Sequence, residues 1–184
     1  RMKVITINQT RTVLFAVCSL FATALHAGEK SAGNNVSLSV DGKDINVTFY
    51  SSDIVRVTKT PVGSNATEVK SEVVTMKPKT DFAVDVAYGT SKVRMKSKTL
   101  MVDIDRRTGL LVFYSESGKL LLKEKNIGFE KRDEGSDKGR YQVTHTYQLE
   151  KNEAIYGLGT VQDGKLNRRG LSKIVEQTNL EDFQ

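Results

Sequence analysis

The sequence is poor in the residues that build covalent and metal-dependent sites. Its 184 residues include one cysteine, Cys18, and two histidines, His26 and His145. One cysteine cannot form an internal disulfide, and a chain that loses Cys18 with a leader peptide has no thiol chemistry. A single remaining histidine, without a G-x-S-x-G motif, argues against zinc and against a serine–histidine–acid triad. We therefore expect no cofactor and no bound metal.

The sequence also lacks an apolar run of the roughly 20 residues that a membrane-spanning helix needs. Residues 2–27 instead combine two basic residues, an uncharged and largely apolar run at 12–24, and small-residue cleavage sites. This pattern is typical of a secretory signal peptide. We expect a helical signal peptide over 1–27, no membrane span after cleavage, and export to the periplasm, cell surface or medium. The alternatives are a membrane anchor and a lipoprotein attached through Cys18.

Strong positive charge is missing as well. The formal net charge is +6, and residues 1–27 hold three basic and no acidic residues, so removing them leaves +3. No basic stripe is interleaved with aromatic residues, which is the usual footprint of nucleic-acid binding. Nucleic acid is therefore not an expected partner.

Helical periodicity is hard to find after the leader, and period-2 alternation takes its place. Apolar residues alternate with polar ones in VSLSV (36–40) and DINVTFY (44–50), and the pair Asp41-Gly42 between them is a typical hairpin turn. Similar segments follow at 53–60, 82–89, 91–97, 99–105, 107–124 and 140–150. Short alternating runs broken by turn residues indicate half-buried strands. The sequence predicts an all-β, antiparallel β-sandwich over 36–184, preceded by a linker at 28–35.

Three residues are candidates for chemistry. Asp103 and Asp105 share one face of a strand and could bind Ca²⁺ or act in acid–base catalysis. Because the opposite face is apolar, a solvated outer face is the favoured interpretation. His145 falls on the apolar face of its strand with no obvious carboxylate partner, which favours a packed or edge histidine over a catalytic base.

The stretch EAIYGLGTVQDGKLNRRG (153–170) has too few glycines for a dinucleotide fingerprint, and Gly157 and Gly159 indicate special backbone geometry instead. With the later Q-x-N, it resembles the segment that joins the N-terminal β-sandwich to the catalytic barrel in glycoside hydrolase family 31. The matching residues are Glu153, Tyr156, Gly157, Leu158, Gly159, Gln162, Asp163, Gly164, Leu166, Asn167, Gly170, Gln177 and Asn179. Upstream, Arg56 in VTFYSSDIVRV and the stretch LMVDIDRRTGLLVFYSESGKLLLKE resemble strands of the same family.

The resemblance implies a galactose-mutarotase-like supersandwich packed on a barrel, with residues 157–184 leading toward that barrel. Family members are retaining α-glycosidases (α-glucosidases and α-xylosidases) whose two catalytic aspartates lie on the barrel, which implies that this chain alone is not catalytic. The implied substrate is an α-linked oligosaccharide or glycoside. By position, Gln177 and Asn179 are the implied sugar-facing residues, with Asp163, Arg168 and Arg169 in the same loop. The alternative role for Gln177 and Asn179 is to satisfy backbone groups of that loop.

Two other functions remain open at this point. The chain could be a free-standing secreted β-sandwich that binds glycan or a protein partner. An independent mutarotase-like enzyme is less favoured, because sugar epimerisation needs a histidine and an acid, and His145 alone does not supply both.

Overall fold

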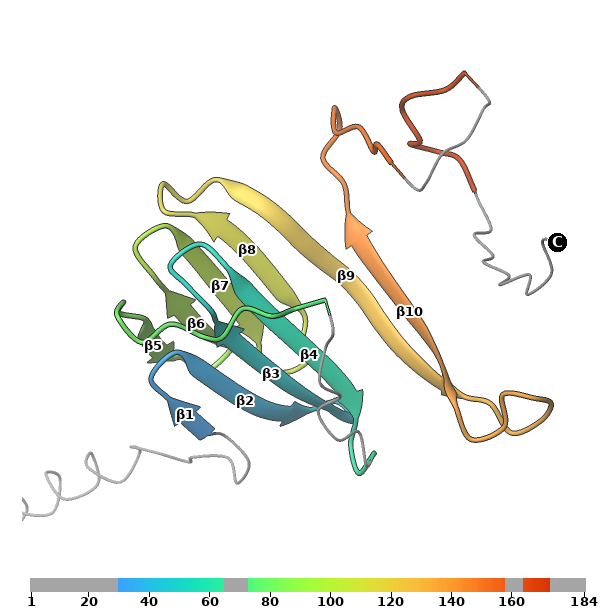
Figure 1. Ribbon diagram of the computed structural model, residues 1–184, viewed down its shortest axis with the longest axis horizontal. Helices are drawn as coiled ribbons and strands as arrows, with labels where there is room; N and C mark the ends of the chain where they lie inside the picture. Colours follow the sequence, from blue (N-terminus) through green and yellow to red (C-terminus); the bar gives the residue numbers. More distant parts are fainter. Residues whose placement is uncertain (1–29, 65–72, 158–163, 173–184) are drawn as a thin grey trace, which may run out of the picture. The chain divides into compact units, whose positions relative to one another are not determined.

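The computed structural model describes residues 30–64, 73–157 and 164–172, and all regular secondary structure in these ranges is β-strand (Figure 1). The strands are β1 (Lys30–Ala32), β2 (Asn35–Val40), β3 (Lys43–Phe49), β4 (Val55–Pro61), β5 (Asp85–Tyr88), β6 (Lys92–Lys96), β7 (Leu100–Asp105), β8 (Leu111–Ser115), β9 (Leu120–Lys131) and β10 (Tyr141–Gln148). They fall into two compact units that divide between Lys119 and Leu120. Within the described ranges, no helix is long and apolar enough to cross a membrane.

The first unit is a β-sandwich. One sheet has the strand order β1-β2-β3-β4, and the strands of the other sheet follow as β5-β6-β7-β8, with antiparallel neighbours throughout. Both sheets contribute apolar side chains to one core: Val36, Leu38, Ile45, Val47, Phe49, Val93, Met95, Val102, Ile104 and Leu111. These are the inward positions of the predicted alternation, so the prediction of an all-β sandwich is confirmed.

The predicted hairpin between β2 and β3 is also confirmed. Val40 pairs with Lys43, which leaves Asp41 and Gly42 as a two-residue loop with φ values of 50° and 71°. Positive φ at both central residues defines the type I′ turn, whose twist suits an antiparallel pair. The Lys43 ammonium donates to the Asp41 carbonyl oxygen at 2.8 Å and also to the Asp41 carboxylate, and the bond to the carboxylate together with the charge of Lys43 lowers the pKa of Asp41.

Some strand boundaries differ from the prediction. β1 lies inside the stretch expected to be a linker, since a three-residue strand leaves no alternation to detect. β5 covers Asp85–Tyr88 rather than the whole of 82–89, although Phe82 and Val84 still pack against the core. The expected signal peptide over 1–27 lies outside the described residues.

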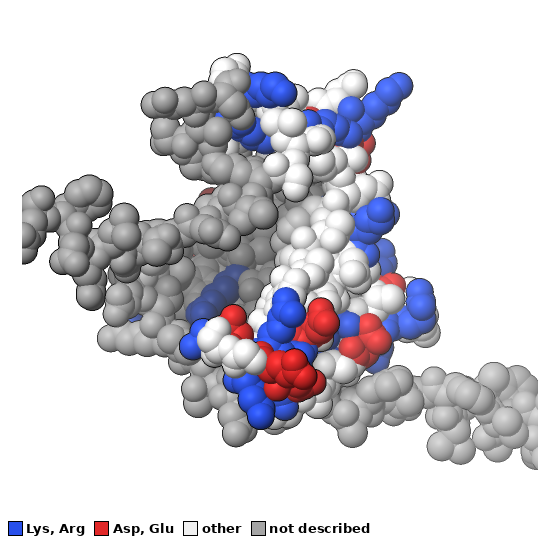
Figure 2. Space-filling view, turned by 90° about the vertical axis from the view of Figure 1, so that its right-hand side faces the viewer, with Lys and Arg blue, Asp and Glu red and all other residues white. Residues whose placement is uncertain are grey.

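The second unit contains a long hairpin of β9 and β10 (Figure 1). The loop between them is rich in charged residues (Figure 2), and its glycines Gly135 and Gly139 adopt positive φ. All eight residues of β10 are exposed. The expectation of a buried apolar face on this strand is therefore wrong, and Tyr141, Val143 and Tyr147 are 41%, 57% and 41% exposed.

Candidate functional site

The Asp103 side chain on β7 is buried, and both of its carboxylate oxygens accept hydrogen bonds. Its Oδ1 accepts from Arg94 Nε at 2.6 Å, while its Oδ2 accepts from Arg94 Nη2 and Lys92 Nζ, both at 2.7 Å. Arg94 is its direct cross-strand partner on β6. The predicted solvated outer face is thus wrong for Asp103, which is 5% exposed because two cations from the adjacent strand cover it. Burial alone would raise the pKa of Asp103, but the hydrogen bonds and charges of Arg94 and Lys92 outweigh it and lower the pKa.

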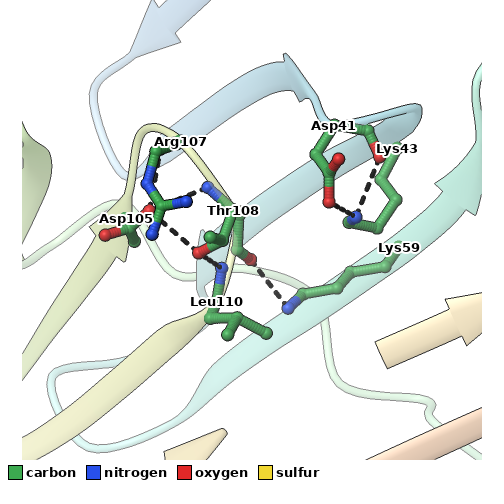
Figure 3. A network of polar contacts seen from close by, with 8 residues as sticks. Asp41, Lys43, Lys59, Asp105, Arg107, Thr108 and Leu110 are labelled. Atoms are coloured by element: carbon green, nitrogen blue, oxygen red, sulfur yellow. Dashed lines mark hydrogen bonds and ion pairs between the residues drawn. The ribbon is translucent and has the colours of Figure 1, made fainter. Parts of the chain in front are cut away.

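Asp105 has a different structural task, at the turn that joins β7 to β8 (Figure 3). Its Oδ1 accepts from the backbone N–H groups of Arg107 and Thr108, at 3.0 and 2.8 Å, and from the Thr108 hydroxyl at 2.8 Å. Burial raises the pKa of Asp105, yet these bonds and the charge of Arg107 leave it below its ordinary value. Asp103 and Asp105 therefore hold the sheet and the turn, and neither is free for catalysis.

The last position of this turn, Gly109, requires glycine for two reasons. Its φ is +70°, and an added Cβ would stand 2.3 Å from the Cδ1 atom of Ile45 on β3. Its carbonyl oxygen accepts from the Lys59 ammonium of β4 at 2.9 Å, so the turn of one sheet is tied to the other sheet (Figure 3). The turn from Asp105 to Gly109 thus connects the two layers of the sandwich.

His145 on β10 has a carboxylate partner, Glu124, that was not expected from the sequence. Its Nε2 atom lies 2.9 Å from Glu124 Oε1, and its Nδ1 atom lies 3.0 Å from the Tyr147 hydroxyl. The rings of His145 and Tyr147 pack with centroids 4.3 Å apart. Glu124 is 4% exposed, and burial, followed by the Glu124 charge, raises the pKa of Tyr147. Within the described ranges, no third His, Cys, Asp or Glu joins this pair to form a metal group.

A β-bulge creates this cluster. His145 pairs with Ile127, but two residues further on Tyr147 pairs with Glu124, because the register shifts between Thr146 and Tyr147. Residues directly opposite each other share a face of the sheet. The extra residue on β9 therefore brings Glu124 and Ile127, three positions apart, onto the face of His145. In a strand without a bulge, Glu124 and Ile127 would lie on opposite faces because they are three positions apart.

The segment that resembles family 31 is held together by side-chain bonds to backbone groups. Residues 150–157 and 164–172 are called the C-terminal segment from here on. The Asn167 Oδ1 atom accepts from the N–H groups of Ile155 and Arg169, at 3.1 and 3.0 Å. Between them, the Arg168 N–H donates to the Ile155 carbonyl at 2.7 Å. One amide side chain thereby joins two stretches that are 12 residues apart in sequence.

Arg169 adds a second tie to the same segment. Its Nη1 atom donates to the carbonyl oxygens of Glu150 and Glu153, both at 2.6 Å. The Glu153 carboxylate in turn accepts from the Glu150 N–H at 2.9 Å. The predicted special backbone at Gly157 is confirmed by its φ of +98°. In the sequence, Glu153, Asn167 and Gly170 stand out only because they match the family 31 pattern. In the structure, the side chains of Glu153 and Asn167 accept hydrogen bonds from backbone N–H groups of the C-terminal segment.

Gln177 and Asn179, the residues implied to face sugar, lie outside the described residues, so their roles stay predictions. Asp163, from the same loop, lies outside them as well. Gly159 lies outside them too. Arg168 and Arg169 are described: Arg168 is 8% exposed, and Arg169 makes the carbonyl contacts above.

Comparison with known proteins places these features in a family. No curated protein matches the chain. The solved structures that share its fold include the α-xylosidase of glycoside hydrolase family 31 from Xanthomonas citri (TM-score 0.67, 23% identity) and a family 31 α-xylosidase from a soil metagenome, complexed with xylose (TM-score 0.63, 20% identity). The matches cover 77% and 78% of this chain but only 16% and 24% of those proteins. Residues 44–183 match the glycosyl hydrolase 31 N-terminal galactose mutarotase-like domain, and the chain therefore belongs to that domain family.

Proposed function

We propose that the chain serves as the non-catalytic N-terminal domain of an α-glycoside hydrolase. The observation that carries the proposal is the family match over residues 44–183. Three carboxylates of the described residues add support, because a retaining glycosidase needs two carboxyl groups about 5–5.5 Å apart that are free to attack and to transfer protons. Asp103, Asp105 and Glu124 are instead committed to cations, turn amides and His145.

The proposed task has two parts. The sandwich braces a catalytic domain, and the chain that follows YGLG lends polar groups to the sugar pocket. Gln177 and Asn179 are the proposed sugar contacts, since an amide both donates to and accepts from hydroxyl groups. The C-terminal segment supports this role because Asn167 and Arg169 tie together residues on both sides of 158–163.

The proposed substrate is an α-linked glucoside or xyloside. Both matched structures are α-xylosidases, and one holds xylose, which makes α-xylosides the first class to assay. We also propose that the protein is exported, on the basic and apolar pattern of residues 2–27. Fusing residues 1–35 to a reporter enzyme and following its export tests that point separately.

Reading the gene beyond codon 184 tests the domain assignment. The proposal expects an in-frame continuation that encodes a catalytic domain, and expression of that longer protein should yield hydrolysis of aryl α-xylosides or α-glucosides. A stop codon followed by unrelated sequence would contradict it and favour the free-standing glycan- or protein-binding module.

A further inference from the structure

The hairpin turn between β2 and β3 contains a chemically reactive pair, Asp41-Gly42. In such a pair the glycine nitrogen can attack the aspartate side-chain carboxyl carbon, because glycine has no side chain to hinder the approach. A carbon–nitrogen bond forms, the carboxyl oxygen leaves as water, and a cyclic succinimide results. Water then opens the ring at either carbonyl, which gives aspartate or isoaspartate. In isoaspartate the main chain runs through the side-chain carbons, and no reactant other than water is needed.

The structure leaves the attacking atom of this pair outside the ladder of strand hydrogen bonds. Val40 pairs directly with Lys43, so Asp41 and Gly42 make up the whole loop. Gly42 is held through its carbonyl oxygen, which accepts from the Val62 N–H at 3.0 Å. Its nitrogen has no hydrogen-bond partner among the residues that the structure describes. Ring closure therefore breaks no hydrogen bond at the Gly42 nitrogen.

The Lys43 side chain opposes the reaction. Its Nζ atom donates to Asp41 Oδ2 and, at 2.8 Å, to the Asp41 carbonyl oxygen (Figure 3). The Lys43 side chain is 9% exposed, so its packing holds the ammonium at this position. The carboxyl group must leave this ammonium before it can turn toward the Gly42 nitrogen.

The charge of Lys43 acts in the same direction as its hydrogen bonds. Only a protonated carboxyl group can lose an oxygen as water, and a neighbouring cation favours the ionised carboxylate. The hydrogen bond and charge of Lys43, followed by the charge of Arg107 in the β7–β8 turn, lower the pKa of Asp41. The unreactive form of the carboxyl group is therefore the favoured one in the folded protein.

We propose that Asp41 is a site of spontaneous isoaspartate formation, and that Lys43 restrains this conversion in the folded protein. Isoaspartate would add one atom to the main chain of a two-residue loop. The type I′ turn is specific for two residues with positive φ, so the longer main chain should disturb the Val40–Lys43 pair. All of these groups belong to the first unit, and the proposal does not depend on the proposed glycosidase role.

Peptide mapping by liquid chromatography and mass spectrometry tests the proposal in the full chain. Aspartyl and isoaspartyl peptides have equal mass but separate on the column. The tripeptide Asp-Gly-Lys occurs at 41–43 and again at 163–165, which supplies a matched internal reference. In urea, Asp41 and Asp163 should convert at similar rates. In the folded chain, Asp41 should convert at least about tenfold more slowly than in urea, because local opening must precede ring closure.

Variants at Lys43 test the restraint itself. Lys43→Met keeps a long side chain at this buried position but removes the ammonium, so Asp41 should convert about three- to tenfold faster in the folded chain. Lys43→Arg keeps a cation and should preserve the slow rate. Lys119→Met, which removes a charge from the exposed β8–β9 turn, should leave the rate unchanged.

Matching far-UV circular dichroism of these variants shows that each is folded. Slow conversion that returns with Lys43→Arg and is lost with Lys43→Met supports the proposal. Equal rates in the folded unmodified chain and in folded Lys43→Met would overturn it. Absence of isoaspartate at Asp41 in urea would overturn it as well.

Discussion

Gly109 lies against Ile45 so closely that a Cβ atom at position 109 would stand 2.3 Å from the Ile45 Cδ1 atom. The turn between β7 and β8 thus presses directly on the facing sheet. The Lys59 ammonium of β4 donates to the Gly109 carbonyl at 2.9 Å, so a hydrogen bond also joins this turn to the facing sheet. Because the two layers are this close at Gly109, a single added methyl group at this position should lower the stability of the sandwich.

Gly109→Ala should lower the free energy of unfolding by about 3 kcal/mol, because it combines a strained positive φ with overpacking of the core. Gly118→Ala is the matched control: Gly118 also has a positive φ, of +81°, but nothing lies within 4 Å of an added Cβ. Its cost should be about 1 kcal/mol. Urea denaturation of both variants measures the difference, and equal losses would show that Gly109 is not packed as described.

The pairing of Asp103 should appear in the pH dependence of stability. Its pKa is lower in the folded protein than its ordinary value of 3.8. A lowered folded pKa stabilises the protein above the unfolded pKa, and this stabilisation is lost as the pH falls through the folded value. We therefore expect Asp103→Asn to lose about 1–2 kcal/mol at pH 7 and to show a flatter decline below about pH 4.

Asp137→Asn is the control for that experiment. Asp137 pairs with Arg140 on the surface, where the carboxylate side chain is 62% exposed. Exposed pairs contribute little, so stability should change by less than about 0.5 kcal/mol. Denaturant titrations between pH 2 and about pH 7 compare the two variants across the range where carboxylates titrate. An Asp103→Asn profile that parallels the unmodified protein would argue against the ion pair.

Asn167 should control the opening of the C-terminal segment. Asn167→Ala removes the acceptor for the N–H groups of Ile155 and Arg169, so these amides should exchange hydrogen about 5- to 10-fold faster. Asn167→Asp keeps an oxygen at the same position and should preserve the protection. Leu166→Ala, at a neighbouring side chain that is 78% exposed, serves as the control. Unchanged exchange in Asn167→Ala would show that other contacts hold the segment.

The Glu124–His145–Tyr147 cluster predicts a shifted tyrosine titration. Burial and the Glu124 charge both raise the pKa of Tyr147 above its ordinary value of 10.0. Glu124→Gln removes the charge but keeps the burial, so the pKa of Tyr147 should fall only part of the way back. Nuclear magnetic resonance of labelled tyrosine side chains follows each phenol separately. A Tyr147 titration that is identical in Glu124→Gln would contradict the influence of the Glu124 charge on Tyr147.

Much of the fold was predictable because alternation is clear wherever one face of a strand is buried. β2 and β3 show this best, since Val36, Leu38, Ile45 and Val47 all point into the core. The Asp41-Gly42 turn was predictable for a separate reason: few residues tolerate positive φ at both positions of a two-residue loop. β10 alternates just as clearly, yet its whole length is exposed, because alternation alone does not show what covers a face.

The predictions for His145 and Asp103 were wrong because their surroundings depend on how neighbouring strands pair. The bulge opposite Thr146 and Tyr147 moves Glu124 onto the face of His145, and no local pattern signals it. Asp103 is buried because Arg94 sits directly across from it, and that register is set by the whole sheet. The family motif drew attention to the segment around Asn167, but the hydrogen bond of Asn167 depends on Ile155, 12 residues earlier.

Hydrolysis of nitrophenyl α-xyloside and α-glucoside by this 184-residue chain is the most direct test of the proposed function. A non-catalytic N-terminal domain should show no turnover above the buffer blank at any pH, even at high protein concentration. Turnover that follows the protein through purification and disappears when its carboxylates are replaced would contradict the assignment of a non-catalytic domain.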